Sequence, residues 1–109
     1  MENLGFKNGD RYEIFIGIKD KDSYEEILSV NDFKEILCDM CVEKEINFSL
    51  LTQLGGYAHD KGYTTETSLR IVIIGINEKE VELLSKKLKE KINTDAVLIV
   101  KSEIEYCFI

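Results

Sequence analysis

The spacing of apolar residues switches repeatedly between a period of two and the helical period, and this order most constrains the fold. Apolar residues alternate over Tyr12 to Ile18 and again over Asn47 to Tyr57, and they run almost without interruption from Leu69 to Ile76. Alternation predicts a strand with one buried face, and a continuous run is typical of a strand covered on both faces. A fourth strand is predicted near the end, where Leu98, Val100, Ile104, Tyr106 and Phe108 share one parity.

Two segments between these strands have helical spacing. We expect Asp32 to open the first helix, whose apolar stripe is Phe33, Ile36, Leu37, Met40 and Cys41. We expect Asn77 to cap the second helix, whose stripe is Val81, Leu84, Leu88 and Ile92. Each cap is followed three residues later by a glutamate, which is the spacing of a capping box. Ser23 and Glu26 have the same spacing, so a short helical turn is predicted over Tyr24 to Leu28.

The resulting order, βαββαβ, predicts an α+β, ferredoxin-like fold: a four-stranded antiparallel sheet with two helices on one face. At 109 residues the chain is expected to form a single domain over 1–109. The first and third strands are central in this topology, and both carry apolar residues on both faces. We expect the face opposite the helices to carry Phe15, two alternate members of Ile71 to Ile74, and Val97 with Ile99.

An apolar sheet face of this kind is uncommon on a monomer. Self-association through the open sheet face is therefore predicted, and another protein partner is the second way of covering it. Alternatively, the first ten residues and the segment from Lys19 to Val30 cover it within one chain.

The chain is acidic, with 21 acidic residues against 14 basic ones and a net charge of −7. Such a charge repels phosphate backbones, so electrostatics disfavour direct binding of nucleic acid. Mimicry of nucleic acid, or binding to a basic partner, is the contrasting interpretation of the same charge. No apolar run is long enough for a membrane span and the N-terminus lacks an apolar core, so a cytoplasmic protein without membrane contact is expected.

Three cysteines, Cys38, Cys41 and Cys107, argue against a disulfide framework because their number is odd. The first two form a C-x-x-C inside the first predicted helix, more than a turn from its N-terminus. Redox pairs instead use the helix N-terminus, where the dipole lowers the thiol pKa. A structural role is predicted for this pair and no metal site is expected.

The segment from Gly55 to Arg70 is interpreted as a hairpin loop that concentrates polar residues and the single histidine. The candidate ligand-binding residues are Gly55, Gly56, Tyr57, His59, Lys61 and Arg70. Glycines permit close approach of a ligand, and Lys61 with Arg70 could hold a phosphate or carboxylate. His59 beside Asp60 could act as an acid or base. A plain solvated hairpin explains the same composition, and the sequence names no cofactor.

The order of elements, with a hairpin excursion after the second strand, resembles the nitrogen-regulatory PII and PII-like group. Leu51 to Tyr57, LTQLGGY, is similar to the end of that group's second strand, and Leu69 to Ile92 to its third strand and second helix. The resemblance implies trimers that bind nucleotides between subunits and signal through the hairpin.

Three functions are compatible with these observations. The first is a non-enzymatic, homo-oligomeric binding or regulatory domain, with a small anion or nucleotide held by the 55–70 hairpin at a subunit boundary. The second is a small acidic inhibitor of phage type, an anti-defence protein that binds a larger host protein. The third is a small ferredoxin-like enzyme that uses His59. The two-sided apolar sheet and the polar hairpin favour the first of these functions, and the lack of a second catalytic motif places the enzyme last.

Overall fold

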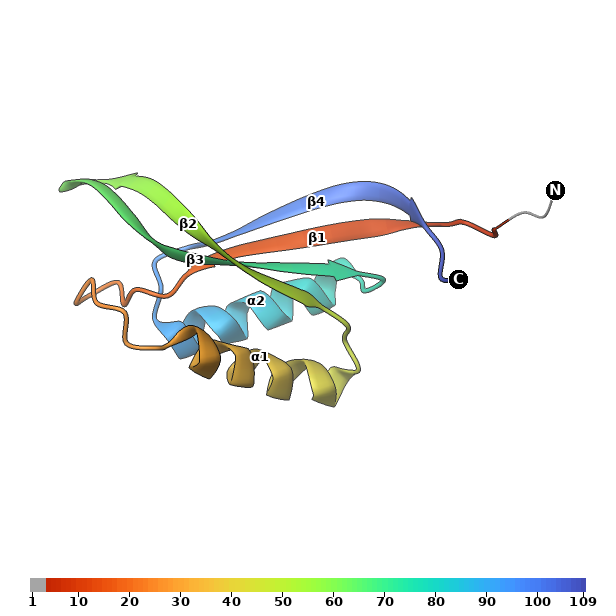
Figure 1. Ribbon diagram of the computed structural model, residues 1–109, viewed down its shortest axis with the longest axis horizontal. Helices are drawn as coiled ribbons and strands as arrows, with labels where there is room; N and C mark the ends of the chain where they lie inside the picture. The colour runs from red at the N-terminus through yellow and green to blue at the C-terminus, as the bar shows by residue number, and fades with distance from the viewer. Residues whose placement is uncertain (1–3) are drawn as a thin grey trace.

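The structure is a computed structural model that describes residues 4–109, and it contains one sheet with two helices on one face (Figure 1). Its elements are β1 (Lys7–Gly17), α1 (Val30–Lys44), β2 (Ser49–His59), β3 (Gly62–Ile74), α2 (Glu78–Ile92) and β4 (Val97–Tyr106). All strand pairs are antiparallel and the order across the sheet is β2-β3-β1-β4. The predicted α+β, ferredoxin-like fold is confirmed, with β1 and β3 in the centre.

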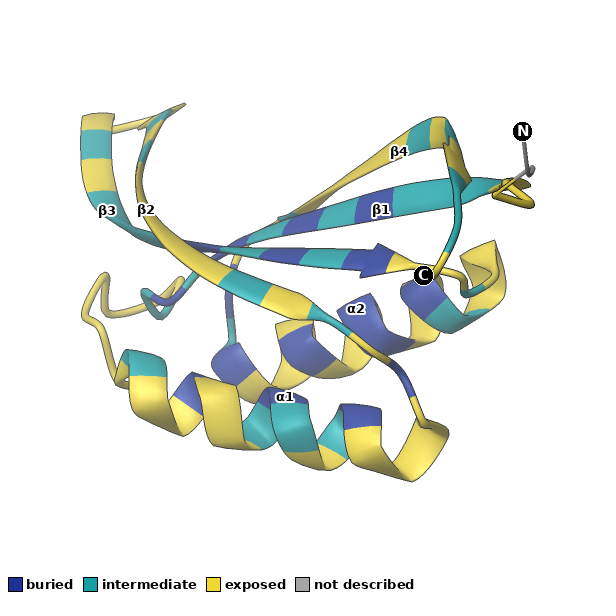
Figure 2. Cartoon of the chain, turned by 45° about the vertical axis from the view of Figure 1, so that its right-hand side comes forward, coloured by how far each residue is buried: buried dark blue, intermediate teal, exposed yellow. Residues whose placement is uncertain are grey.

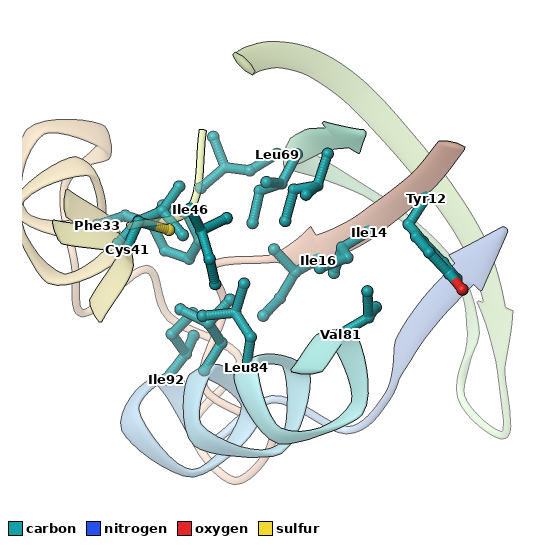
Figure 3. Close-up of a cluster of buried hydrophobic side chains, with 14 of the residues drawn as sticks. Tyr12, Ile14, Ile16, Phe33, Cys41, Ile46, Leu69, Val81, Leu84 and Ile92 are labelled. Atoms are coloured by element: carbon teal, nitrogen blue, oxygen red, sulfur yellow. The ribbon is translucent and has the colours of Figure 1, made fainter. Parts of the chain in front are cut away.

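The core lies between the sheet and the two helices (Figure 3). Ile14 of β1 pairs with Ile71 of β3 on one side and with Ile99 of β4 on the other. The stripes of both helices pack against this row, with Phe33, Leu37, Leu88 and Ile92 fully buried. Figure 2 shows the buried residues of both helices on the sides that face the sheet. The predicted helical stripes therefore form the core with alternate residues of the central strands.

The open face of the sheet differs from the prediction in one strand. Phe15, Val72 and Ile74 lie on it as expected, because their neighbours in sequence form the core. Val97 and Ile99 do not, since β4 pairs Val97 with Ile16 and Ile99 with Ile14, both core residues. The register instead places Leu98 and Val100 on the open face, opposite Phe15 and Glu13. A shift of one residue in register exchanges the two faces of a strand. The prediction that Val97 and Ile99 lie on the open face was therefore wrong, because sequence parity alone does not set the register of β4.

Segments that were predicted to cover the open face are placed elsewhere. β1 begins at Lys7, five residues earlier than predicted, and Lys7 pairs with Tyr106, so residues 7–10 lengthen the sheet. Residues 1–3 lie outside the described residues. The segment from Lys19 to Ser29 lies at the end of the sheet beside the hairpin (Figure 1). The open face is thus left uncovered by the described part of the chain.

The first helix begins earlier than the sequence pattern indicated. Ser29, not Asp32, is the N-cap: its hydroxyl accepts from the Asp32 amide, and the Asp32 carboxylate accepts from the Ser29 amide. Asp32 is therefore the third residue of a capping box that begins at Ser29. The turn predicted over Tyr24 to Leu28 is not helical, because the Ser23 hydroxyl accepts from Glu25 two residues on, as in a local turn. Asn77 caps α2 as predicted, accepting from the Glu80 amide at 2.9 Å.

Neither helix in residues 4–109 is long and apolar enough to cross a membrane.

The position of the first cap gives a stability prediction. Replacing Ser29 by Ala removes the acceptor for the Asp32 amide, so the free energy of unfolding should fall by about 1 kcal/mol. Ser23→Ala is the control, because its hydroxyl caps no helix, and it should change stability by less than about 0.5 kcal/mol. Urea denaturation of both variants measures the difference. Equal losses in the two variants would contradict the assignment of the cap.

Candidate functional site

The 55–70 segment is not a loop. β2 continues to His59 and β3 begins at Gly62, so only Asp60 and Lys61 form the turn. Gly62 completes this tight connection in a backbone conformation, φ 131°, that only glycine adopts readily. The candidate residues are therefore held by the backbone pairing of β2 and β3, and their side chains point alternately to the two faces of the sheet. Odd-numbered residues of β2 up to His59 share the face of Arg70 and Phe15.

A pocket of about 270 Å³ lies where the hairpin extends past the end of β1. The hairpin, the segment after β1 and the turn before β4 all meet at this end of the molecule (Figure 1). The pocket is lined by Gly17, Lys19, Asp20, Lys21, Tyr24, Tyr57, Ala58, His59, Glu66, Thr94, Asp95 and Ala96. We call it the Glu66 pocket, after the acidic residue that β3 directs into it.

The Glu66 carboxyl group is the most unusual polar group of this pocket. Its Oε2 atom is buried and has no hydrogen-bond partner among residues 4–109. Burial raises the pKa of Glu66 above its usual value of 4.5, and the Lys19 amide and ammonium group offset only part of this effect. A buried acceptor without a partner is costly in a folded protein. A ligand that supplies a positive charge or a donor would remove this cost.

A close approach at Gly17 makes room for this carboxyl group. A Cβ atom at position 17 would lie 2.8 Å from the Glu66 Cδ atom and even closer to Oε1. The carboxyl group thus rests against the backbone of β1, at the last residue of the strand. Any side chain at position 17 would displace it from the pocket.

Tyr57 and His59 supply aromatic walls from β2. Burial raises the pKa of Tyr57, and the nearby charge of Glu66 raises it further, so the phenol stays protonated and available as a donor. The His59 and Tyr57 ring centroids are 5.8 Å apart. His59 Nδ1 accepts from the Lys61 amide at 3.2 Å, so Nε2 is the nitrogen that donates to the Thr64 hydroxyl at 2.7 Å. The His59 side chain is 18% exposed, and it therefore lies in a pocket rather than free in solvent.

Other candidate residues have different surroundings. Lys61 places its ammonium group 5.4 Å from the centre of the Tyr24 ring. Arg70 donates to Glu13 Oε1 at 2.8 Å on the open face and lies over Phe15. Lys61 and Arg70 are therefore engaged by different partners and do not converge on one anion. Their predicted role in ligand binding stays a prediction.

Gly55 and Gly56 are explained by contacts across the hairpin. A Cβ atom at Gly55 would lie 2.8 Å from the Ser68 Cβ atom, and one at Gly56 would lie 2.6 Å from the Tyr63 hydroxyl. Both glycines thus let β3 side chains lie over β2. The structure brings only Tyr57 and His59 of the six candidates into the Glu66 pocket.

The cysteines are free thiols in the described chain. Cys41 is buried in the core, and desolvation raises the pKa of its thiol, which disfavours the reactive thiolate. Residues 4–109 contain no group of three or more histidine, cysteine, aspartate or glutamate residues arranged to hold a metal ion.

Sequence reasoning missed Glu66 and Gly17 as a pair. Glu66 was one of many polar residues in the hairpin, and Gly17 lay inside the predicted strand over Tyr12 to Ile18, 49 residues before it. Their proximity depends on the pairing of Gly17 with Ser68. Glu66 is two residues before Ser68 on β3, so its side chain lies on the same face of the sheet. One signal was available: Glu66 is the one acidic residue between Asp60 and Ile76.

Comparisons with known proteins place the fold. No protein-family model and no curated protein sequence matches the chain. A phage SAM lyase in its apo state is 25% identical, with a TM-score of 0.75 over 97% of this chain and 92% of that one. The same kind of protein in complex with S-methyl-5′-thioadenosine is 22% identical, with a TM-score of 0.72 over 99% and 95%.

A second group of solved structures is similar at lower scores. CPII, a nitrogen-regulatory PII-like protein from Thiomonas intermedia K12 bound to ADP, AMP and bicarbonate, is 12% identical. Its TM-score is 0.55 over 93% of this chain and 97% of that one. The predicted outline resemblance to the PII-like group is therefore confirmed at the level of the fold.

The raised pKa of Glu66 predicts how stability depends on pH. Because the folded state disfavours the charged carboxylate, stability falls as the pH rises from the unfolded pKa of about 4.5 to the raised pKa of the folded state, and the penalty is complete above it. Glu66→Gln should therefore gain in melting temperature relative to the unmodified chain as the pH rises from about 4.5 to 8. Thermal unfolding across this range measures the difference.

Glu82→Gln is the matched control for this measurement. Glu82 pairs with Lys86 at 2.8 Å, and its pKa is lowered chiefly by that hydrogen bond. The trend for this variant should have the opposite sign, since the charged form stabilises the folded state. A Glu66→Gln variant that loses stability with rising pH would show that the carboxylate has a structural partner.

Proposed function

We propose that the chain binds S-adenosylmethionine in the Glu66 pocket and cleaves it to release S-methyl-5′-thioadenosine. The observation that carries the proposal is the partly buried carboxyl group of Glu66, whose Oε2 atom is buried and has no hydrogen-bond partner among the described residues, in a pocket with aromatic walls. The likeness to phage SAM lyase over nearly the whole chain supports the same ligand class. This proposal departs from the sequence-based preference for a non-enzymatic domain.

The charge of the ligand explains the chemistry of the pocket. S-adenosylmethionine carries a positive sulfonium, and a partly desolvated carboxylate attracts such a cation more strongly than it would in water. S-methyl-5′-thioadenosine has a neutral thioether in place of the sulfonium. Glu66 would thus favour substrate over product, and loss of the charge would promote product release. Aromatic rings such as Tyr57 and His59 suit the flat purine of the adenosyl group.

The proposed step balances without any second reactant. The bond between sulfur and the amino-acid chain breaks, and its electron pair stays on sulfur. The carbon that loses sulfur gains a bond to an oxygen of the substrate's own carboxylate, so the fragment closes to a lactone. The positive charge of the sulfonium and the negative charge of the substrate carboxylate are both lost in this step. A site that excludes water favours a reaction that removes opposite charges. If Glu66 instead removed a proton, the fragment would carry vinyl protons, which proton NMR distinguishes from the lactone.

Replacing Glu66 by Gln gives the sharpest test of this proposal. The variant keeps the shape of the side chain and removes its charge, so kcat/KM for S-adenosylmethionine should fall about 10²-fold. The dissociation constant for S-methyl-5′-thioadenosine should change by less than about threefold, since its sulfur is neutral. Chromatography of the released product measures the first quantity, and isothermal titration calorimetry the second.

Glu43→Gln is the control, because Glu43 is exposed on α1, outside the residues that line the pocket. This variant should match the unmodified chain in both measurements. The proposal fails if the unmodified chain releases no S-methyl-5′-thioadenosine. It also fails if Glu66→Gln weakens the binding of the neutral product as much as the binding of the substrate, because recognition of the sulfonium charge would then play no part.

A nucleotide-binding regulatory role is the second candidate. Lys19 and Lys21 line the pocket and could meet the phosphates of an adenine nucleotide. The likeness to CPII, which is bound to ADP and AMP, supports this role in outline. Tight binding of ADP by a chain that binds no S-methyl-5′-thioadenosine would favour it over the lyase.

Self-association through the open sheet face is part of the same proposal. The face carries apolar side chains of all four strands: Phe15, Leu51, Val72, Ile74, Leu98 and Val100. Among them the Nε atoms of Arg11 and Arg70 are buried and lack hydrogen-bond partners in the described chain. A second copy of the chain would cover the apolar residues and could supply acceptors for these atoms. Glu66 shares this face with Arg70, so the partner copy would lie beside the pocket.

A charge on the open face should prevent this assembly. Leu98 is 60% exposed on the edge strand β4, where it pairs with Phe15, and Leu98→Lys would place an unpaired ammonium group in the interface. Native mass spectrometry should show an oligomer for the unmodified chain and a monomer for this variant. Val42→Lys is the control, because Val42 is 76% exposed on α1, in the other layer. A monomeric unmodified chain would contradict self-association.

The phage-type inhibitor that binds a larger host protein stays a prediction. Mimicry of nucleic acid would require six acidic residues to converge: Glu25, Glu26, Glu43, Glu45, Glu103 and Glu105. Glu25 and Glu26 precede α1, whereas Glu43 and Glu45 lie at its opposite end (Figure 1). The arrangement does not gather these four into one stripe.

A further inference from the structure

Tyr24 lines the Glu66 pocket and has an unusual backbone conformation. Its φ angle is 60°, in the left-handed region that bulky residues rarely adopt. Strained residues of this kind persist only where the surrounding structure holds them, and they gather at functional sites. The question is therefore what holds Tyr24 in place and what its side chain contacts.

Asp20 fixes the backbone on the N-terminal side of Tyr24. Its carboxylate accepts from the amides of Asp22 and Ser23 at 3.1 and 2.9 Å. The side-chain amide of Asn93, which ends α2, donates to both Asp20 and Asp22. The Lys21 amide also donates to the Asn93 carbonyl at 2.9 Å. We call this set of contacts the Asp20 clamp, and it ties the segment after β1 to the end of α2.

The ring of Tyr24 reaches the tip of the hairpin. Its centroid lies 5.9 Å from that of His59, and the Lys61 ammonium group lies 5.4 Å from it. The tip is the part of the hairpin that extends beyond the body of the sheet (Figure 1). Contacts of a cation and a second ring with an aromatic face are favourable. The ring therefore joins two walls of the Glu66 pocket that come from distant parts of the chain.

We propose that Tyr24, held by the Asp20 clamp, is a positioning residue that fixes the hairpin tip over the Glu66 pocket and slows ligand release. The positioning of the tip is a property of the ligand-free chain. The effect on ligand release rests on the proposed function. Within the clamp Asn93 acts at a distance, because it does not line the pocket, whereas Asp20 does.

The ligand-free chain offers a direct readout, since His59 is its single histidine. Asparagine tolerates the left-handed conformation, so Tyr24→Asn removes the ring and keeps the backbone. Asn93→Gly keeps the left-handed end of α2, which suits glycine, and removes the donor to Asp20. Both variants should shift the His59 ring resonances in proton NMR, and Asn93→Gly should speed amide exchange at Asp22 and Ser23. Tyr24→Phe is the control, which keeps the ring and should leave the resonances in place.

The second readout is the dissociation rate of S-methyl-5′-thioadenosine by stopped flow. This rate should rise about tenfold in Tyr24→Asn and Asn93→Gly and stay unchanged in Tyr24→Phe. His59 resonances that do not move in Tyr24→Asn would overturn the proposal, and so would unchanged exchange in Asn93→Gly. If the unmodified chain binds no S-methyl-5′-thioadenosine, the proposed function fails. The positioning role is then still decided by the spectra and the exchange rates.

Discussion

The antiparallel register between β1 and β3 is the constraint on which the rest of the structure depends. It pairs Ile14 with Ile71 and Ile16 with Leu69, which places four core side chains under the helices. The same register places Phe15 beside Arg70 on the opposite face and ends at Gly17 beside Ser68. A slip of one residue would exchange the two faces of β1 and bury its charged residues. Core, open face and pocket therefore follow from one alignment of two strands.

In the Glu66 pocket, desolvation of a carboxylate lowers the stability of the folded chain. Glu66 is partly desolvated beside the backbone of Gly17, and its raised pKa reflects this burial. A carboxylate that is partly desolvated, with one oxygen lacking a hydrogen-bond partner among the described residues, destabilises the folded chain at neutral pH. The remaining acidic residues lie mostly on exposed positions of helices and edges, where solvent screens them. Glu66 thus differs from the other acids of the chain in its surroundings rather than in its chemistry.

The two faces of the sheet have different demands. The helix face is satisfied within the chain by the stripes of α1 and α2. The open face combines apolar side chains with an ion pair between Arg70 and Glu13. The Glu13 side chain is largely buried even in a single copy of the chain. The two faces differ because the described chain provides only two helices, and both pack on the same side. An explanation of the function has to account for the open face as well as for the pocket.

By itself, the sequence determined the order of elements, the fold class and the residues of both helical stripes, because these depend on local periodicity and on burial. It also pointed to the hairpin as the region of Tyr57 and His59. Tertiary structure decided which residues of β4 face the helices and that Ser29 begins α1. It also decided that Glu66, Gly17 and Tyr24 meet in one pocket. These features depend on strand register and on contacts between segments far apart in sequence, and a local pattern of residues carries no information about either.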